Sequence, residues 1–329
     1  MIYYTSHFSG CGGSTIGAIA AGLKPISAIE FDPKIAELYE VNCGDVVVED
    51  ITQVNFKKLD IPTKKERNGE ILIHQTSPPC QDFSRANTSA NKSSDRANVL
   101  GATHEFYNLY EPEFIVLENV PAYAKAGVYQ EFESFLINKG YRILKGKFNA
   151  ADYGVPQTRE RFLSIAITKG FDIPQIISTH GKQEGIQINL LTKPWIGWYE
   201  AIADLIPTLP DSHLTPKQKE AANGQSNLLI ERIGYRDNPS VRKLSEPCWT
   251  IRATLGDDKK GGNRSKVIDA ILDNATVKSI NTLALARLQS FPDSYNWSGK
   301  AAVDTKGIGN SVAPLLIQRI CEAIKLILN

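Results

Sequence analysis

The stretch IYYTSHFSGCGGSTIGAIAAGLKPISAIEF, residues 2–31, decides the fold. Its β-rich start, Ile2–His7, runs into a glycine cluster, and the helical segment Ser14–Ala21 separates that cluster from a second β-rich run, Ile26–Phe31. A strand, a glycine turn, a helix and a further strand form the repeating unit of a parallel α/β sheet. Glycines at such a turn let the backbone approach a ligand and leave the N–H groups of the helix N-terminus free to bind it. The opening therefore predicts a ligand-binding strand–helix–strand unit.

The same alternation continues through the first half of the chain. Further strands are predicted at Asp45–Glu49, Ile71–Gln75, Phe114–Glu118, Tyr141–Phe148 and Phe162–Ile167, and further helices at Pro33–Val41, Gly101–Tyr110 and Gln130–Asn138. Beyond about Gly170 the alternation fails, and helical periodicity returns only at Thr282–Gln289 and Val312–Leu328. We expect three parts: an α/β, doubly wound, Rossmann-like large domain (1–210), a smaller irregular, loop-rich domain (211–285), and a hinge with a C-terminal helix that returns to the large domain (286–329).

Composition excludes several classes of protein. Lys and Arg number 37 against 36 Asp and Glu, so the net charge of +1 rules out a globally basic nucleic-acid coat. A hydrophobic fraction of 42% excludes disorder, no apolar run approaches the roughly 18 residues of a membrane span, and the start lacks the pattern of a secretory signal. Five widely spaced cysteines without a CxxC pair favour a reducing cytoplasm, with no disulfide framework and no metal site.

Acidic residues end the second and third predicted strands. Glu30 follows the glycine cluster by about 20 residues, where a carboxylate can hold the two hydroxyls of a ribose. Asp50 ends the third strand, where it can meet an adenine amino group or cap a helix. The glycine spacing is not GxGxxG, so an adenosine-containing cofactor other than a dinucleotide remains open.

A second set of chemical groups follows the later strands. Cys80 sits in Ser77-Pro78-Pro79-Cys80-Gln81, directly after the fourth strand, and two prolines stiffen the approach to it. The polar stretch 85–98 beside it is a candidate lid. Glu118 ends a buried strand, where a carboxyl group is costly unless it is paired or functional. Arg159 and Arg161 alternate on an extended segment, so both are expected to point to one side.

Taken in order, these residues resemble the DNA (cytosine-5)-methyltransferase family over nearly the whole chain. The matching segments are Phe8–Gly13, Ser77–Ser84 with its Pro-Cys-Gln, Glu118-Asn119-Val120, Gln157–Arg161, Ser245–Ile251, Arg287–Pro292 and Gly307–Val312. Ser6 and His7 stand where many members have Asp-Leu, and Ser77 stands where many have Gly. The resemblance implies an S-adenosylmethionine-dependent methyltransferase domain beside a target-recognition domain.

The resemblance also implies roles for individual residues. Cys80 would add to C6 of a flipped-out cytosine, Glu118 would bind N3 and the exocyclic amine, Arg161 would hold O2, and Arg159 would support the loop or a phosphate. The cofactor S-adenosyl-L-methionine would be bound by Phe8, Ser9, Gly10, Cys11, Gly12, Gly13, Glu30, Phe31, Asp50, Ile51, Pro79, Asn310 and Ser311. No metal is expected.

The second domain is expected to read the DNA sequence. Between Glu231 and Lys266 nine Lys or Arg and five Asp or Glu give a local net charge of +4. The predicted contacts to double-stranded DNA are Ser84, Arg85, Arg96, Arg242, Arg252, Lys259, Lys260, Asn263 and Arg264. A monomer is expected, with a separately acting restriction endonuclease as a candidate partner.

Three alternatives stay open at this point. A relative within the family acts on transfer RNA, although the Cys-Phe-Thr tripeptide typical of that branch is missing from this sequence. A nicotinamide-dependent oxidoreductase would explain the glycine turn and Glu30 but not Cys80. A non-catalytic DNA-binding regulator would leave both Cys80 and Glu118 without a purpose.

Overall fold

The chain forms two compact units in the computed structural model, which describes residues 1–79, 99–182, 192–231, 239–253, 268–273 and 276–328. The first unit comprises Met1–Phe148, Glu160–Ile176 and the C-terminal segment from Ile317, and the second comprises Asn149–Arg159 and Ile177–Leu316. The first unit is therefore discontinuous in sequence. The chain leaves it at Asn149, returns at Glu160 and leaves it again at Ile177, earlier than the boundary expected near residue 210.

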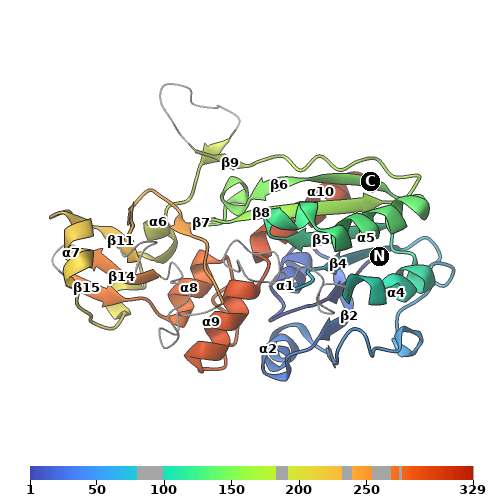
Figure 1. Ribbon diagram of the computed structural model, residues 1–329, viewed down its shortest axis with the longest axis horizontal. Coiled ribbons are helices and arrows are strands. Elements are labelled where there is room, and N and C mark those ends of the chain that lie inside the picture. Colours follow the sequence, from blue (N-terminus) through green and yellow to red (C-terminus); the bar gives the residue numbers. More distant parts are fainter. Residues whose placement is uncertain (80–98, 183–191, 232–238, 254–267, 274–275, 329) are drawn as a thin grey trace. The chain divides into compact units, whose positions relative to one another are not determined.

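A seven-stranded sheet forms the centre of the first unit (Figure 1), in the order β3-β2-β1-β4-β5-β8-β6. The strands are β1 (Ile2–His7), β2 (Lys24–Glu30), β3 (Val47–Val48), β4 (Ile71–Thr76), β5 (Phe114–Asn119), β6 (Arg142–Asn149) and β8 (Glu160–Ile167). Strands β1 to β5 are parallel, and β8 runs antiparallel to β5 with Glu118 opposite Leu163. The amino end of β8 therefore shares an edge with the carboxyl ends of the parallel strands, where open α/β sheets bind ligands.

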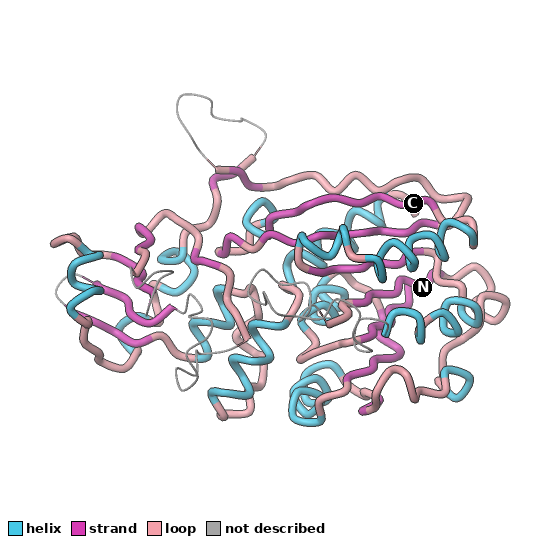
Figure 2. The backbone as a smooth tube through the Cα atoms, viewed as in Figure 1, coloured by secondary structure: helices cyan, strands magenta, loops and turns pink. Residues whose placement is uncertain are grey.

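Helices cover both faces of this sheet (Figure 2). On one face Lys325 of α10 (Pro314–Leu326) donates to the Ala21 carbonyl after α1 (Gly13–Ala20), and Thr15 of α1 bonds Tyr39 of α2 (Pro33–Cys43). On the other face the aromatic side chains of α4 (His104–Tyr110) and α5 (Gly127–Asn138) share a core with β4 and β5. Short helices complete the unit: η1 (Phe56–Lys58), α3 (Val99–Ala102) and η3 (Pro121–Lys125). This is the doubly wound arrangement that the alternation predicted.

One predicted helix, Gly101–Tyr110, is two helices in the structure. The break falls between α3 and α4 at Thr103, whose side-chain hydroxyl donates to the Leu100 carbonyl at 2.6 Å. A threonine that bonds its own backbone in this way competes with the helical hydrogen bonds. The hydrophobic periodicity does not register this break, because both halves bury the same face.

The second unit holds more regular structure than the sequence suggested. A four-stranded antiparallel sheet runs in the order β12-β11-β14-β15, and Ala222, Leu228 and Ile230 form its small core. Its strands are β11 (Leu228–Glu231), β12 (Val241–Lys243), β14 (Ile268–Asp273) and β15 (Thr276–Ser279). The expectation of an irregular domain over 211–285 is wrong in this respect, because strands of three to six residues leave too little alternation to detect.

Helices and short strand pairs make up the rest of the second unit. The helices are α6 (Trp198–Ile202), α7 (Pro216–Ala222), α8 (Thr282–Leu288), α9 (Ala301–Asn310), η4 (Ala150–Tyr153) and η5 (Ile206–Thr208). Strand β7 (Gln157–Thr158) pairs with β13 (Cys248–Trp249), and β9 (His180–Gly181) pairs with β10 (Lys193–Pro194). The pairing of β7 with β13 joins two of the segments that carry family motifs.

Gly309 allows a close backbone approach inside the second unit, which gives a first prediction. A Cβ atom at Gly309 would overlap the backbone of Arg252 and Ala253, which cannot move aside as a side chain could. Gly309→Ala should therefore destabilise this unit by about 3 kcal/mol, the upper end of overpacking costs. Gly127→Ala is the matched control, because a Cβ there meets open space.

The measurement is thermal unfolding followed by tryptophan fluorescence. All four tryptophans, Trp195, Trp198, Trp249 and Trp297, belong to the second unit and report on it. Circular dichroism follows the Gly127→Ala control, which should unfold at the wild-type temperature or slightly above it. An unchanged fluorescence transition in Gly309→Ala would contradict the close approach.

Candidate active site

The glycine-rich turn Phe8–Gly13 links β1 to α1, and polar contacts with β2 hold it in place. The Ser9 hydroxyl donates to the Ile29 carbonyl at 3.1 Å, and the Gly10 amide donates to Glu30 Oε2 at 2.8 Å. Gly12 has φ of 85°, and a Cβ atom there would lie 2.5 Å from Cys43 Sγ. Phe8 also has a left-handed backbone, with φ of 55°, which costs a residue with a side chain roughly 1–2 kcal/mol. The turn is thus fixed before any ligand binds.

Glu30 ends β2, and Asp50 follows the neighbouring parallel strand β3 by two residues, at the same edge. The second oxygen of Glu30, Oε1, accepts from the Asp32 amide at 2.9 Å, so backbone N–H groups fix the plane of this carboxylate. Each oxygen keeps a further lone pair, which a ribose hydroxyl can use. Asp50 is exposed, and its Oδ1 accepts from the amide and hydroxyl of Thr52 at 2.9 and 2.8 Å. Its Oδ2 is the oxygen that can meet an adenine amino group.

An apolar surface lies beside these carboxylates. The Phe31 side chain follows Glu30 and is 68% exposed, while Ile51 beyond Asp50 is buried. A large exposed aromatic ring next to two orienting carboxylates suits a planar base. The donor set therefore fits an adenosine-containing cofactor, with the ribose at Glu30 and the base between Phe31 and Asp50.

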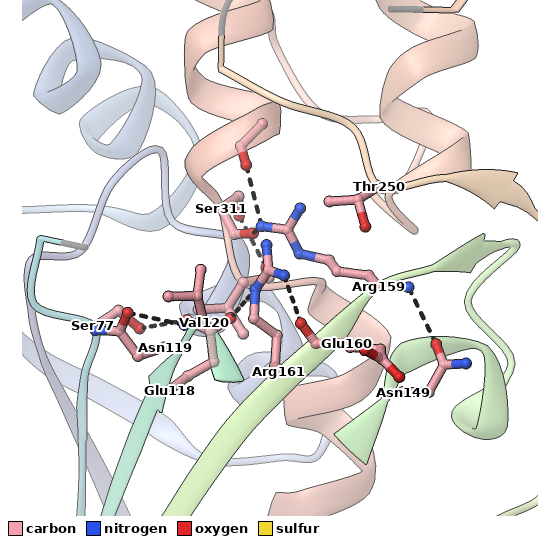
Figure 3. A network of polar contacts seen from close by, with 12 residues as sticks. Ser77, Glu118, Asn119, Val120, Asn149, Arg159, Glu160, Arg161, Thr250 and Ser311 are labelled. Carbon is pink, nitrogen blue, oxygen red and sulfur yellow. Dashed lines mark hydrogen bonds and ion pairs between the residues drawn. The ribbon is translucent and has the colours of Figure 1, made fainter. Parts of the chain in front are cut away.

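Two charged side chains meet at the end of β5 (Figure 3). Arg161 Nε lies 2.8 Å from Glu118 Oε1, and the side chains are 12% and 7% exposed. The register of β8 against β5 produces this pair, since Arg161 precedes the residue opposite Asn119. The Asn119 amide donates to the Pro78 carbonyl at 2.9 Å and so ties the chain before Cys80 to the same edge. A carboxylate and a guanidinium at a ligand-binding edge can bind a flat, polar heterocycle.

Arg159 has partners different from those of Arg161. Its side chain is buried in the second unit, and its guanidinium donates to the carbonyls of Ile251, Gly309 and Ser311 at 2.8–3.1 Å. Of the two roles expected for Arg159, support of the loop or of a phosphate, these contacts match the first. Three carbonyls take up this guanidinium because an arginine can satisfy several buried acceptors at once. Arg159 is a positioning residue that binds three chain segments together.

Two glutamines, not predicted from the sequence as site residues, reinforce this Arg159 cluster. Gln157 donates to Gln289 Oε1 at 2.5 Å and accepts from the Ile251 amide, and Gln289 donates to the Ser311 carbonyl at 2.9 Å. Both side chains are fully buried. A polar residue within a motif that resembles a known family was the signal that could have identified Gln157, but its partner lies 132 residues away.

Several other predicted site residues belong to the second unit, are exposed or lie outside the described part of the chain. Asn310 is exposed at the end of α9 and Ser311 is buried, and both belong to the second unit, so their assignment to the cofactor stays a prediction. Pro79 is exposed at the last described position of its segment. The predicted site residues that lie outside the described part of the chain are Cys80, Ser84, Arg85, Arg96, Lys259, Lys260, Asn263 and Arg264.

The two described arginines predicted to bind DNA differ from each other. Arg252 is exposed at the start of the segment that runs into residues 254–267. Arg242 pairs with Glu246 at 3.3 Å, and its guanidinium lies 5.2 Å from the centre of the Trp249 ring. Its carbonyl also accepts from the Trp198 indole at 3.3 Å. Arg242 thus has structural contacts within its own unit.

The fold and this edge define an α/β enzyme with a site for an adenosine-containing cofactor beside paired acidic and basic groups. The family model described as C-5 cytosine-specific DNA methylase matches residues 3–326, and the chain belongs to this family of DNA cytosine-5 methyltransferases. It is 28% identical to the Type II methyltransferase M.NgoFVII of Neisseria gonorrhoeae, over 97% of this chain and 85% of that protein. It is 27% identical to the Type II methyltransferase M1.HphI of Haemophilus parahaemolyticus, over 98% and 86%.

A solved structure agrees at the level of the fold. The S. pombe Dnmt2 methyltransferase superposes with a TM-score of 0.65 over 100% of both chains, at 17% sequence identity. Within the described part of the chain, no helix combines the length and the apolar character needed to cross a membrane.

Proposed function

We propose that this enzyme transfers a methyl group from S-adenosylmethionine to C5 of a cytosine that is flipped out of a specific duplex DNA sequence. The observation that carries the proposal is the buried pair of Glu118 and Arg161 at the ligand-binding edge, beside the chain that leads to Cys80. Membership of the family makes cytosine the target base. The edge then supplies two groups for the three polar positions of that base.

The chemistry assigned to Cys80 follows from the weakness of C5 as a nucleophile. The Cys80 thiolate forms a bond to C6, which moves an electron pair onto the ring and makes C5 an enamine carbon. Glu118, carrying or sharing a proton, donates to N3 and accepts from the exocyclic amine, and Arg161 donates to O2, so both stabilise the charge that the addition creates. Loss of the C5 proton after methylation lets the C6–S bond break and returns Cys80 as a thiolate. Since C6 is out of reach inside a base stack, the cytosine must leave the helix.

The residues proposed to hold the cofactor surround the turn after β1. S-adenosylmethionine supplies the electrophilic methyl group when it is bound. Glu30 orients the ribose through the face that its two backbone donors leave open. Phe31 and Asp50 bind the adenine, and the turn Phe8–Gly13, whose Gly10 and Gly12 N–H groups bond Glu30 and Ser9, lies at the methionine end.

Double-stranded DNA is the proposed macromolecular substrate, read by a monomer through the second unit. The relatives reported above carry Type II methyltransferase names. Those names support a separately acting restriction endonuclease as a companion of this enzyme. The described contacts favour Arg252 over Arg242 as a residue that meets DNA.

A pair of substitutions tests this difference. Arg252→Ala should weaken DNA binding and, for a lost phosphate contact, lower the salt slope of binding by about one. Arg242→Ala should instead lower the unfolding temperature of the second unit, because it removes a cation–π contact worth about 1 kcal/mol or more. Binding to cognate and scrambled duplexes at several salt concentrations, with tryptophan fluorescence for stability, separates the two. An Arg242→Ala variant of normal stability and weak DNA binding would reverse the assignment.

The substrate itself is tested with labelled S-adenosylmethionine. Purified enzyme is incubated with plasmid DNA and, in parallel, with bulk transfer RNA, and the labelled polymer is identified. Label in plasmid DNA is the expected result, and bisulfite sequencing of the product then gives the base and its sequence context. Label confined to transfer RNA would overturn the proposal in favour of the RNA-modifying alternative.

A further inference from the structure

A directed chain of hydrogen bonds connects α1 to the carboxylate of Glu118. Ser14 donates to Gln75 Oε1 at 3.0 Å, Gln75 Nε2 donates to the Ser77 hydroxyl at 2.5 Å, and that hydroxyl donates to Glu118 Oε2 at 3.3 Å. Ser14, Gln75 and Glu118 are 2%, 1% and 6% exposed. All four residues belong to the first unit. Such a chain is costly to bury unless each donor meets an acceptor, and here each one does.

The chemistry of the amide sets the direction of this chain. The Nε2 group of Gln75 can only donate, so the Ser77 oxygen must accept from it. A serine hydroxyl has one proton. Because Gln75 donates to a lone pair of the Ser77 oxygen, the Ser77 proton is available to donate to Glu118. Ser77 therefore acts as a donor of fixed orientation.

Glu118 has an ion pair at one oxygen and a hydrogen bond at the other. Arg161 Nε lies 2.8 Å from Oε1, and the Ser77 hydroxyl lies 3.3 Å from Oε2 (Figure 3). Because the Ser77 hydroxyl bonds Oε2 directly while the Arg161 charge faces Oε1, the two contacts together fix the rotation of the carboxylate about its last bond. The terminal torsion of a glutamate is otherwise broad.

We propose that Ser77 is a positioning residue that orients Glu118 for the target base. Gln75 of β4 and Ser14 of α1 hold the Ser77 hydroxyl in its orientation. The proposal rests on the role of Glu118 in the proposed function. Ser77 stands where many family members have glycine, which has no hydroxyl. Because Ser14 is the second residue of the helix that follows the glycine-rich turn, the chain of hydrogen bonds also joins the cofactor turn to the carboxylate.

The test replaces Ser77 in two ways. Ser77→Gly removes the hydroxyl and should lower kcat by roughly ten- to a hundredfold, the effect of one hydrogen bond to a charged group. The KM for DNA and the Kd for S-adenosylmethionine should stay within twofold, because the Ser77 hydroxyl is engaged by Gln75 and Glu118. Ser77→Thr keeps a hydroxyl and should retain most of the activity. Ser134→Ala, at an exposed serine of α5, is the control and should behave as wild type.

A double-mutant cycle shows whether Gln75 acts through Ser77. Gln75→Leu should lower kcat by less than Ser77→Gly, and it should add no further loss in the Ser77→Gly background. Equal kcat in Ser77→Gly and wild type, or a Ser77→Thr variant as slow as Ser77→Gly, would overturn the proposal. The Ser77 variants decide this alone if Gln75→Leu does not fold.

Glu118→Gln separates this proposal from the proposed function. A strong loss in Glu118→Gln with a silent Ser77→Gly removes only the positioning role. Full activity in Glu118→Gln would instead remove the catalytic role of Glu118, and the proposed function would fail at that point.

Discussion

Cys80→Ala is expected to lower methyl transfer more than about a thousandfold while S-adenosylmethionine binding stays within a few-fold, because alanine cannot form the bond to C6. No described cysteine can replace it. Cys11, Cys248 and Cys321 are buried, and burial raises the pKa of Cys321 to about 12 and that of Cys248 further. Burial also raises the pKa of Cys43 to about 12, so its thiolate is scarce at neutral pH.

The measurement pairs a turnover assay with isothermal titration of the cofactor. Cys321→Ala is the matched control, since it removes a buried thiol of α10 and should leave turnover near the wild-type value. Turnover above about a thousandth of wild type in Cys80→Ala would end the covalent role of this residue.

A substrate analogue gives a direct test of the same bond. With 5-fluorocytosine at the target position, the C5 substituent cannot leave as a proton, so the C6–S bond should persist as a stable protein–DNA adduct. The wild-type enzyme should form this adduct and Cys80→Ala should not. An active enzyme that forms no adduct would contradict the covalent mechanism.

The first unit was predictable because its strands are long, apolar and separated by clear turn residues. The predicted strand Ile2–His7 has those bounds in the structure, and Phe114–Glu118 differs from β5 by one residue. Local sequence suffices there, since a buried parallel strand is marked by its own composition. The second sheet was not predictable, since its core needs Ile230 and Val241 to pair across residues that share no local pattern.

The candidate site likewise combines residues that the sequence identifies with contacts that only the fold reveals. Glu118 could be identified from the sequence because a carboxylate on a buried strand needs a partner or a function. Its contact with Arg161 could not, since it depends on β8 running antiparallel beside β5. The role of Arg159 also needed the fold, because the carbonyls it binds lie 92 to 152 residues away.

A buried histidine pair in the first unit makes the enzyme sensitive to acid. His7 of β1 and His74 of β4 pack edge to face at 4.3 Å between ring centres, with Phe106 against both rings. Burial lowers the pKa of His7 from 6.5 to about 3 and lowers that of His74 well below its usual value, with the charge of His7 adding to the effect. Thr5 bonds His74 Nδ1, while His7 Nδ1 and His74 Nε2 have no hydrogen-bond partner among the described residues. Both rings are therefore neutral in the folded protein.

The sign of the pH effect follows from where the protons bind. Between pH 6.5 and about 3 the unfolded chain protonates these histidines and the folded chain does not. The free energy of unfolding therefore falls as the pH drops through this window and is fully recovered above pH 6.5. From pH 7 to pH 5 each histidine should cost about 2 kcal/mol, and the pair about 4 kcal/mol, a large part of a typical total stability.

His7→Leu should reduce that acid loss to about half, because one of the two proton-binding differences disappears. It should not weaken the protein at pH 7, since it replaces a buried ring whose Nδ1 lacks a partner with an apolar side chain. Urea unfolding by circular dichroism at pH 7 and pH 5 gives the loss, and amide exchange in β1 and β4 assigns it to the first unit. The control is His213→Asn, at an exposed histidine of the second unit, which should keep the wild-type pH dependence. If His7→Leu lost as much stability on acidification as the wild type, the neutral buried pair would not be the source of the acid sensitivity.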